Sequence, residues 1–237
     1  MKLSASIYRL KRKARLLSRE KKIPLHEALN RIAIEEGYKQ WSLLSSEVAA
    51  ATTATKLFSQ LRPGELVLIG ARPGQGKTLL AVEILVEAMR AGHRAAFFTL
   101  EFSSKDVSAL FRSVGVDVTS FDGRFDLDTS DAISADLIMK RLAAEPTGTI
   151  AVVDYLQLLD QQRHKPALAD QIEALSAFAR EKGLIIIFLS QIDRSFDASI
   201  KPCPGLEDLR LPNPLDVTVF SKLCFLHKGV VQVQSTH

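Results

Sequence analysis

Residues 65–78 read ELVLIGARPGQGKT, and this stretch decides the fold of the larger part of the chain. Its apolar first half predicts a buried strand, and the apolar spacing over residues 77–91 predicts a helix directly after the glycine-rich segment. A strand, a glycine-rich loop and a helix in this order are typical of a phosphate-binding loop, whose backbone N–H groups surround a phosphate at the positive end of the helix. Ala71 stands where the strict pattern has glycine. A chance glycine-rich turn is the alternative, and the flanking strand and helix argue against it.

The residue types in this loop point to nucleotide chemistry. Gly74 and Gly76 allow unusual backbone conformations and a close approach to phosphate. Lys77 would reach the β- and γ-phosphates, and the Thr78 hydroxyl would hold Mg²⁺, so a phosphate ligand with Mg²⁺ is expected here. The residues expected to bind the nucleotide are Ala71, Arg72, Pro73, Gly74, Gln75, Gly76, Lys77, Thr78 and Leu79.

After this loop the chain alternates apolar runs with helical stretches, which indicates an α/β domain with a mostly parallel sheet. Near-continuous apolar strands suit a sheet that crossover helices cover on both faces. The final stretch, residues 221–235, is expected to form two strands that turn at Lys228 and Gly229. We expect the other strands at residues 65–70, 94–100, 149–154 and 184–190, and helices at residues 77–91, 103–113, 130–144 and 168–182.

Polar residues follow three of these strands, at the sheet edge where open α/β sheets bind ligands. Asp154 follows an apolar run and could hold a water of the Mg²⁺ shell, or simply cap a turn. Glu101 could deprotonate an attacking water as general base, although an isolated Glu at a strand end more often supplies a charge to a helix N-terminus. Gln191 could donate its side-chain amide to the γ-phosphate and report its presence.

The basic side chains are concentrated near the N-terminus of the chain. Residues 1–45 hold eleven Lys or Arg and four acids, a net charge of +7, whereas the whole chain carries +4 and residues 46–237 therefore −3. A basic opening of this kind is found in organelle transit peptides, but apolar residues spaced by three or four over residues 3–22 favour a folded amphipathic helix. A second apolar stripe ends at Gly37, and a third short helix with Trp41 as its core anchor follows.

We therefore expect a basic helical module at residues 1–47, a linker or weak connecting helix at residues 48–56, and the α/β domain at residues 57–237. The module has some spacing of a DNA-binding helix-turn-helix, but Glu36 occupies a usually apolar position, so a small helical bundle with a solvated basic face is the plainer interpretation.

Composition excludes several classes of protein. With 46% hydrophobic and 24% charged residues, the chain is neither disordered, collagen-like nor coiled coil. No apolar run approaches the roughly 20 residues that cross a bilayer, so we expect no membrane partner. Cys203 and Cys224 fit neither a disulfide framework nor a zinc site, which favours a cytoplasmic setting.

Five stretches together carry a resemblance to a known family. ELVLIGARPGQGKT, AAFFTLEFS, IAVVDYLQLL, IIIFLSQIDRS and LEDLR resemble, in order, the motifs of the RecA-like motor domain of DnaB-type replicative helicases, over about residues 57–220. The resemblance implies a RecA-like P-loop NTPase fold and a ring of subunits with ATP and Mg²⁺ between them. It also implies catalytic roles for Lys77, Glu101 as base and Gln191 as γ-phosphate sensor, with Thr78 and Asp154 at the metal.

The same resemblance implies that the loops after Leu159 and Gln191 face single-stranded DNA. Their basic residues suit backbone phosphates, although they also fit ordinary solvated loops: Arg163, His164, Lys165, Arg194 and Lys201. Compared with that family, we expect the chain to lack the helical N-terminal domain and the C-terminal segment that supplies an arginine finger. Substitutes for the finger would be Arg210, Lys222 or Lys228.

Two functions remain open on the sequence. The first is an ATP-hydrolysing, DnaB-like helicase-type protein that acts on or beside single-stranded DNA as a homo-oligomer. The second is a nucleotide-gated module that binds DNA or protein with weak turnover and no unwinding. The Glu101, Asp154 and Gln191 set favours the first, and the missing C-terminal segment favours the second.

Overall fold

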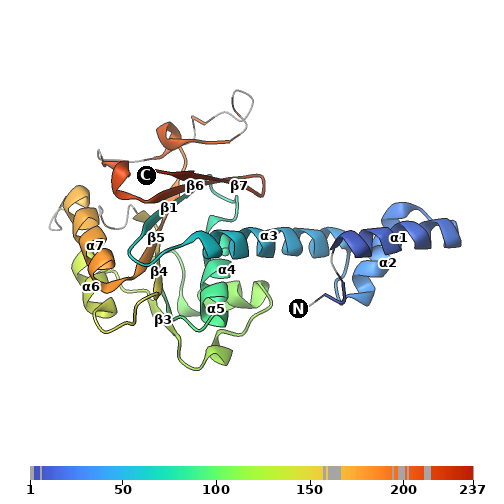
Figure 1. Cartoon of the computed structure of the whole chain (residues 1–237), viewed down its shortest axis with the longest axis horizontal. Helices are drawn as coiled ribbons and strands as arrows, with labels where there is room; N and C mark the ends of the chain where they lie inside the picture. The colour runs from blue at the N-terminus through green and yellow to red at the C-terminus, as the bar shows by residue number, and fades with distance from the viewer. Residues whose placement is uncertain are drawn as a thin grey trace. The chain divides into compact units, whose positions relative to one another are not determined.

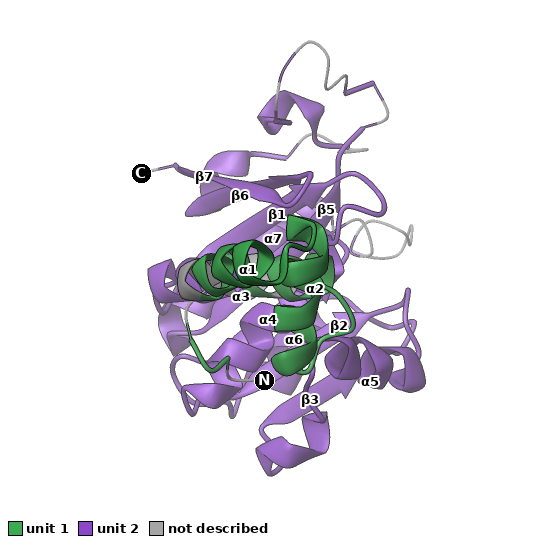
Figure 2. Ribbon diagram, turned by 90° about the vertical axis from the view of Figure 1, so that its right-hand side faces the viewer, with its two compact units in different colours: residues 1–53 green, residues 54–237 purple. Residues whose placement is uncertain are grey.

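The computed structural model describes residues 3–5, 7–156, 159, 167–193, 195–196, 201, 203–210 and 215–236, and of residues 7–9, 47 and 49–52 only the backbone. The chain divides into two compact units, residues 1–53 and residues 54–237 (Figure 2). Each unit has a hydrophobic core of its own. Each unit is described by itself.

The larger unit is built on a seven-stranded sheet with the order β3-β2-β4-β5-β1-β6-β7 (Figure 1). All neighbouring strands are parallel except β6 and β7, which are antiparallel, so the predicted mostly parallel sheet is confirmed. The strands are β1 Leu66–Ala71, β2 Ala95–Thr99, β3 Phe125–Asp128, β4 Ile150–Asp154, β5 Ile185–Gln191, β6 Lys222–His227 and β7 Val230–Ser235.

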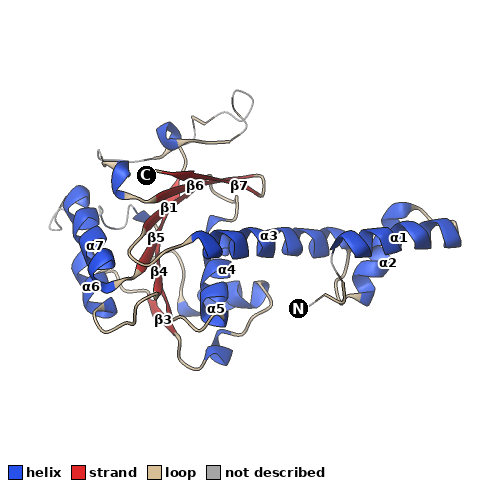
Figure 3. Cartoon of the chain, viewed as in Figure 1, coloured by secondary structure: helices blue, strands red, loops and turns tan. Residues whose placement is uncertain are grey.

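Helices cover both faces of this sheet, as the apolar strands predicted (Figure 3). On one face α4 Lys77–Arg90 and α5 Ser104–Ser113 pack in one core, and on the other α6 Ala135–Leu142 and α7 Leu168–Lys182 pack in a second. Alternate residues of β1 enter the two cores, Val67 and Ile69 the first, Leu66 and Leu68 the second. Short 3-10 helices complete the unit at η1 Val118–Phe121, η3 Leu206–Asp208 and η4 Val217–Val219.

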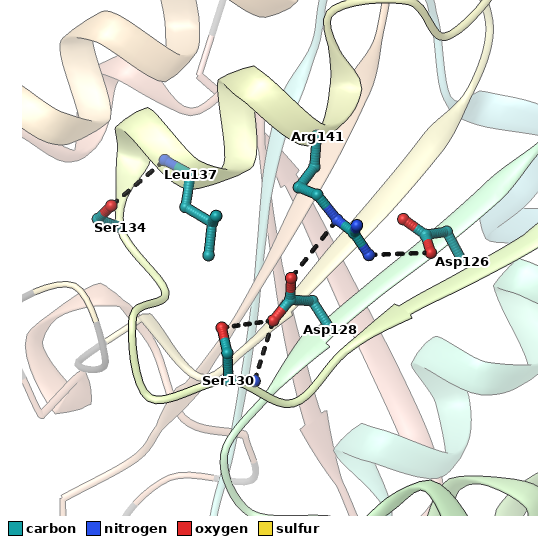
Figure 4. A network of polar contacts seen from close by, with 6 residues as sticks. All are labelled: Asp126, Asp128, Ser130, Ser134, Leu137 and Arg141. Atoms are coloured by element: carbon teal, nitrogen blue, oxygen red, sulfur yellow. Dashed lines mark hydrogen bonds and ion pairs between the residues drawn. The ribbon is translucent and has the colours of Figure 1, made fainter.

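Strand β3 and the start of α6 differ from the sequence prediction (Figure 4). The helix was expected from residue 130, but the backbone N–H and hydroxyl of Ser130 both donate to Asp128 Oδ1, at 2.9 and 2.7 Å. This local turn competes with the helix. The helix starts instead after Ser134, whose hydroxyl accepts from the Leu137 N–H at 3.3 Å. Arg141 of α6 then reaches back to Asp128 and Asp126 of β3.

The predicted hairpin at the end of the chain is confirmed. β6 and β7 pair antiparallel through a two-residue turn, in which Lys228 and Gly229 have φ of 48° and 77°. Positive φ at both central residues is the signature of the turn that matches the twist of a hairpin.

The smaller unit contains α1 Ile7–Lys21, α2 Leu25–Glu35 and the first part of α3 Trp41–Gln60. Trp41 is half-buried and packs against this core, whose fully buried members are Leu10, Ala14, Ala28, Ile32, Ala33 and Leu44. Where the sequence predicted a short helix and then a linker or weak connecting helix, α3 continues unbroken to Gln60. Its alanines have the strongest helix propensity, and Leu57 anchors its end in the core of the larger unit. No helix in the described part of the chain is long and apolar enough to cross a membrane.

Candidate active site

The loop after β1 has the backbone geometry that its glycines predicted. Gly74 and Gly76 have φ of 77° and 87°, a region that residues with a side chain rarely adopt. Gly76 is the residue immediately before α4, and no side chain caps that helix end. The first N–H groups of α4 therefore stay available to an anion at the positive end of the helix.

The side chain of Asp154, the last residue of β4, contacts the first turn of α4. Its carboxylate is fully buried and accepts from Lys77 Nζ at 3.0 Å and from the Thr78 hydroxyl at 2.9 Å. The Lys77 side chain is only 10% exposed. A buried carboxylate is tolerated because both of its oxygens have a partner, one of them charged. The hydroxyl and the carboxylate are hard oxygen donors of the kind Mg²⁺ prefers, so this pair fits the expected metal.

Glu101 stands beyond the end of β2, beside the Asp154 strand. Thr99 pairs with Asp154 in the β2–β4 register, and the Glu101 N–H donates to Thr99 Oγ1 at 3.1 Å. The pKa of the Glu101 carboxyl lies above its ordinary value of 4.5, chiefly because burial desolvates the carboxylate. The negative charge of Asp154 raises this pKa further, and the Lys77 ammonium lowers it. Directly after Glu101, Ser103 and Asp106 form a reciprocal cap that starts α5 and holds this corner of the chain.

Gln191 ends β5 and lies beside the start of the glycine-rich loop. It pairs with Ala71 in the β1–β5 register, and the next N–H, of Ile192, donates to the Ala71 carbonyl at 3.0 Å. The Gln191 carbonyl accepts from the Arg210 N–H at 2.9 Å, which ties the LEDLR segment to the same edge. The structure thus brings the ends of β1, β2, β4 and β5 together, as the sequence predicted.

One contact of the loop has no signal in the sequence. The side-chain carbonyl of Gln75 accepts from the backbone N–H of Lys228 at 2.7 Å, so the β6–β7 turn lies against the loop. The partners are 153 positions apart, and only the register of the hairpin determines which backbone group meets Gln75.

Lys201 and Lys222, which the sequence analysis assigned to DNA contact and to the arginine-finger role, both form ion pairs. Lys201, expected to face DNA, contacts Glu207 and, at 2.5 Å, Asp208, and these partners raise its pKa. Lys222, a substitute for the arginine finger, pairs with Glu65, and both side chains are largely buried. Both ammonium groups thus contact acids of the same unit, and their proposed roles at DNA and as a finger stay predictions. Arg163, His164, Lys165 and Arg194 lie outside the described residues.

Comparisons with known proteins agree with this geometry. The family model described as "ATPase: KaiC" matches residues 56–208. The chain is 28% identical to the replicative DNA helicase DnaB of Treponema pallidum over 222 residues, which cover 79% of this chain and 50% of that protein. It is 26% identical to the DnaB helicase of Helicobacter pylori, covering 73% of this chain and 42% of that protein. The chain thus spans about half the length of the curated relatives it matches.

Solved structures share the fold at lower identity. A DnaB-like replicative helicase, described with its primase interactions, matches with a TM-score of 0.59 and 19% identity, over 93% of this chain and 67% of that one. A KaiC-like protein from the archaeon Pyrococcus horikoshii matches with a TM-score of 0.52 and 16% identity, over 68% of this chain and 70% of that one. These matches confirm the RecA-like fold, and the curated relatives confirm the resemblance to DnaB-type helicases. With its family model covering more than half of its residues, the chain belongs to the KaiC ATPase family.

Proposed function

We propose that the chain binds ATP with Mg²⁺ at the loop after β1, hydrolyses it, and acts on or beside single-stranded DNA as a helicase-type ATPase. The observation that carries the proposal is the arrangement around Asp154, which contacts both Lys77 and Thr78 while Glu101 stands at the neighbouring strand end. Each of these side chains has a distinct role in phosphoryl transfer.

The first turn of α4 binds and orients the phosphates. Its unfilled N–H groups and the Lys77 ammonium provide positive charge for the β- and γ-phosphates. Thr78 and Asp154 are the residues that would hold Mg²⁺. When bound, the metal supplies charge that offsets the negative charge developing on the phosphate oxygens.

Glu101 is the proposed general base. A carboxylate accepts a proton from water more readily when its pKa lies above the ordinary value, and the site raises the pKa of Glu101. Gln191, at the end of β5, would donate its amide to the γ-phosphate, and its backbone bond to Arg210 links that position to the LEDLR segment.

A direct test of the helicase part of the proposal is strand displacement from a forked DNA duplex in the presence of ATP and Mg²⁺. Displacement that requires hydrolysable ATP supports the helicase-type function. ATP-dependent DNA binding without displacement favours the second candidate, a nucleotide-gated module.

The basic face of α1 is the observation that favours this second candidate. In the smaller unit, Lys13 pairs with Glu35 at 2.6 Å, Arg31 with Glu27 at 2.8 Å and Lys21 with Glu20 at 3.9 Å. Four other exposed cations of α1 have no ion pair within the described ranges of the chain: Lys11, Arg12, Arg15 and Arg19. This free charge suits the phosphates of a nucleic acid.

Neutralising these four cations is expected to flatten the salt dependence of DNA binding. The variant carries Gln at Lys11, Arg12, Arg15 and Arg19 in the full chain. The slope of log affinity against log salt should become less negative by about 0.7 for each single-strand phosphate that the protein no longer neutralises. DNA titrations at several salt concentrations, with nucleotide present, measure the slope.

A variant matched in charge separates local binding from net charge. It carries Gln at four exposed cations of the larger unit, namely Lys56, Lys105, Arg112 and Lys140. If both variants have the same slope, α1 does not contact DNA and the basic face is simply solvated.

Asp154→Asn is expected to make activity depend more steeply on Mg²⁺. The amide keeps the shape of the side chain but removes the charge, and losses around a metal site typically cost about 10- to 100-fold in metal affinity. Titrating Mg²⁺ at saturating ATP measures the shift. Asp170→Asn, an exposed acid in the first turn of α7, is the control, and an equal Mg²⁺ requirement in both variants would rule out Asp154 as a metal residue.

A further inference from the structure

The glycine-rich loop is conformationally free on both sides of Gln75. Gly74 and Gly76 have positive φ, and a side chain built on either of them would meet no atom within 4 Å. Glycine loses more backbone freedom on ordering than any other residue, so a loop with two glycines is costly to hold in one conformation. Gln75 stands between them and is half-buried. Its side chain is therefore well placed to anchor the middle of the loop.

The partner of the Gln75 side chain belongs to a distant element. Inside the loop, the Gln75 N–H donates to the Arg72 carbonyl at 3.2 Å. The Gln75 side-chain carbonyl accepts instead from the Lys228 N–H of the β6–β7 turn, at 2.7 Å. This N–H takes no part in the hairpin ladder, whose pairs end at His227 and Val230, because the two central residues of such a turn lie outside it.

The β6–β7 turn is held firmly enough to act as a support. In the parallel pairing of β6 with β1, Leu226 lies opposite Ala71, so the turn stands at the level of the loop that follows β1. The His227 side chain is only 9% exposed and packs edge-on against Phe196, with ring centroids 5.4 Å apart. The turn is thus fixed to β1 through the sheet and packed against the segment that follows β5.

We propose that the β6–β7 turn positions the glycine-rich loop for ATP through this bond, and that Gln75 is a positioning residue of the site. The inference rests on the proposed binding of ATP at the loop after β1. With Gln75 held by Lys228, the loop is ordered before the nucleotide arrives, so less conformational entropy is lost on binding. Bound phosphates order the loop by themselves, so the bond adds to ATP affinity and not to the chemical step.

Direct contact between Gln75 and the nucleotide is the alternative role for this side chain. The two roles differ in their dependence on the Lys228 N–H. A positioning residue loses its effect when that N–H is removed, whereas a residue that contacts ATP does not need it.

Two changes in the full chain remove the bond from opposite ends. Gln75→Met keeps the length of the side chain but removes the acceptor. An ester in place of the amide between His227 and Lys228 removes the donor and keeps the lysine side chain. Ligation at Cys224 of a synthetic peptide of residues 224–237, followed by refolding, introduces the ester, and the ligated chain with all amides is its control.

We expect each change alone to raise the Kd and the KM for ATP about 3- to 10-fold, the range of one hydrogen bond, with kcat unchanged. Because both changes remove the same bond, the two together should weaken binding no more than either alone. Gln60→Met, at the exposed end of α3, is the matched control and should bind ATP like the parent. A fluorescent nucleotide measures Kd, and phosphate release measures KM and kcat.

Hydrogen exchange without nucleotide measures the bond itself. The Lys228 amide should exchange slowly in the parent and fast in Gln75→Met. The amides of β6 that lie between β1 and β7 should stay protected in both proteins, which also shows that the variant folds.

Three results would overturn the inference. Weaker ATP binding by Gln75→Met but not by the ester would assign Gln75 to the nucleotide itself. Unchanged ATP affinity in both altered chains would show that the bond does not prepare the loop. A Lys228 amide equally protected in the parent and in Gln75→Met would show that Gln75 is not its partner. Each of these results leaves ATP binding by the parent intact, whereas a parent that binds no ATP would overturn the proposed function as well.

Discussion

Lys77→Ala is expected to weaken ATP binding about 10- to 100-fold and to abolish hydrolysis. The substitution removes the ammonium nearest the expected β- and γ-phosphates, and hydrogen bonds to charged groups contribute about 1.5–3 kcal/mol. Calorimetry or a fluorescent nucleotide measures affinity, and phosphate release measures turnover.

The same substitution has a structural cost that must be measured separately. Asp154 is fully buried and would retain only the Thr78 hydroxyl as its recorded partner. Removing one partner of a buried ion pair costs about 3–5 kcal/mol, so the melting temperature should also fall. Lys77→Arg keeps the charge beside Asp154 and serves as the control for folding. Unchanged ATP affinity and turnover in a folded Lys77→Ala variant would show that this loop is not the nucleotide site.

Glu101→Gln is expected to retain ATP affinity and to lower turnover about 10²- to 10⁴-fold, the usual contribution of a general base. The amide preserves the shape of the side chain but cannot accept the proton of water. Glu181→Gln, at an exposed position on α7, is the matched control and should hydrolyse ATP like the parent. Equal turnover of Glu101→Gln and the parent would mean that another group is the base.

The raised pKa of Glu101 makes two pH effects observable. Turnover of the parent should fall as the pH is lowered through that raised pKa, because the protonated carboxyl cannot act as base. The free energy of unfolding responds in the opposite sense. The protonated Glu101 carboxyl contributes stability that is complete below its ordinary pKa and is lost as the pH rises through its raised pKa. Without nucleotide, Glu101→Gln should therefore melt no lower than the parent at neutral pH, and thermal melts against pH measure this.

Much of the larger unit was predictable because its signals are local. The apolar runs that become β1, β2, β4 and β5 and the periodicity of α4 and α7 each specify one element without reference to distant residues. β3 was missed because four alternating residues at a sheet edge give too short a pattern. The late start of α6 depends on Ser130 bonding to Asp128 instead of capping the helix, a choice between two serines that spacing does not reveal.

The candidate site was predictable for a topological reason. Parallel strands end at one edge, so polar residues after apolar runs meet there, and Asp154 does contact Lys77 and Thr78. The ion pairs of Lys201 and Lys222 were not predictable, because Glu207 and Glu65 reach them only through the tertiary fold. The bond between Gln75 and Lys228 depends in the same way on the register of a distant hairpin.

The most direct test of the account is steady-state ATP hydrolysis by the full chain with Mg²⁺, with and without single-stranded DNA, beside the Glu101→Gln variant. We expect Mg²⁺-dependent turnover that single-stranded DNA accelerates and that Glu101→Gln lacks. Binding of ATP with no turnover above that of Glu101→Gln, with or without DNA, would contradict the account.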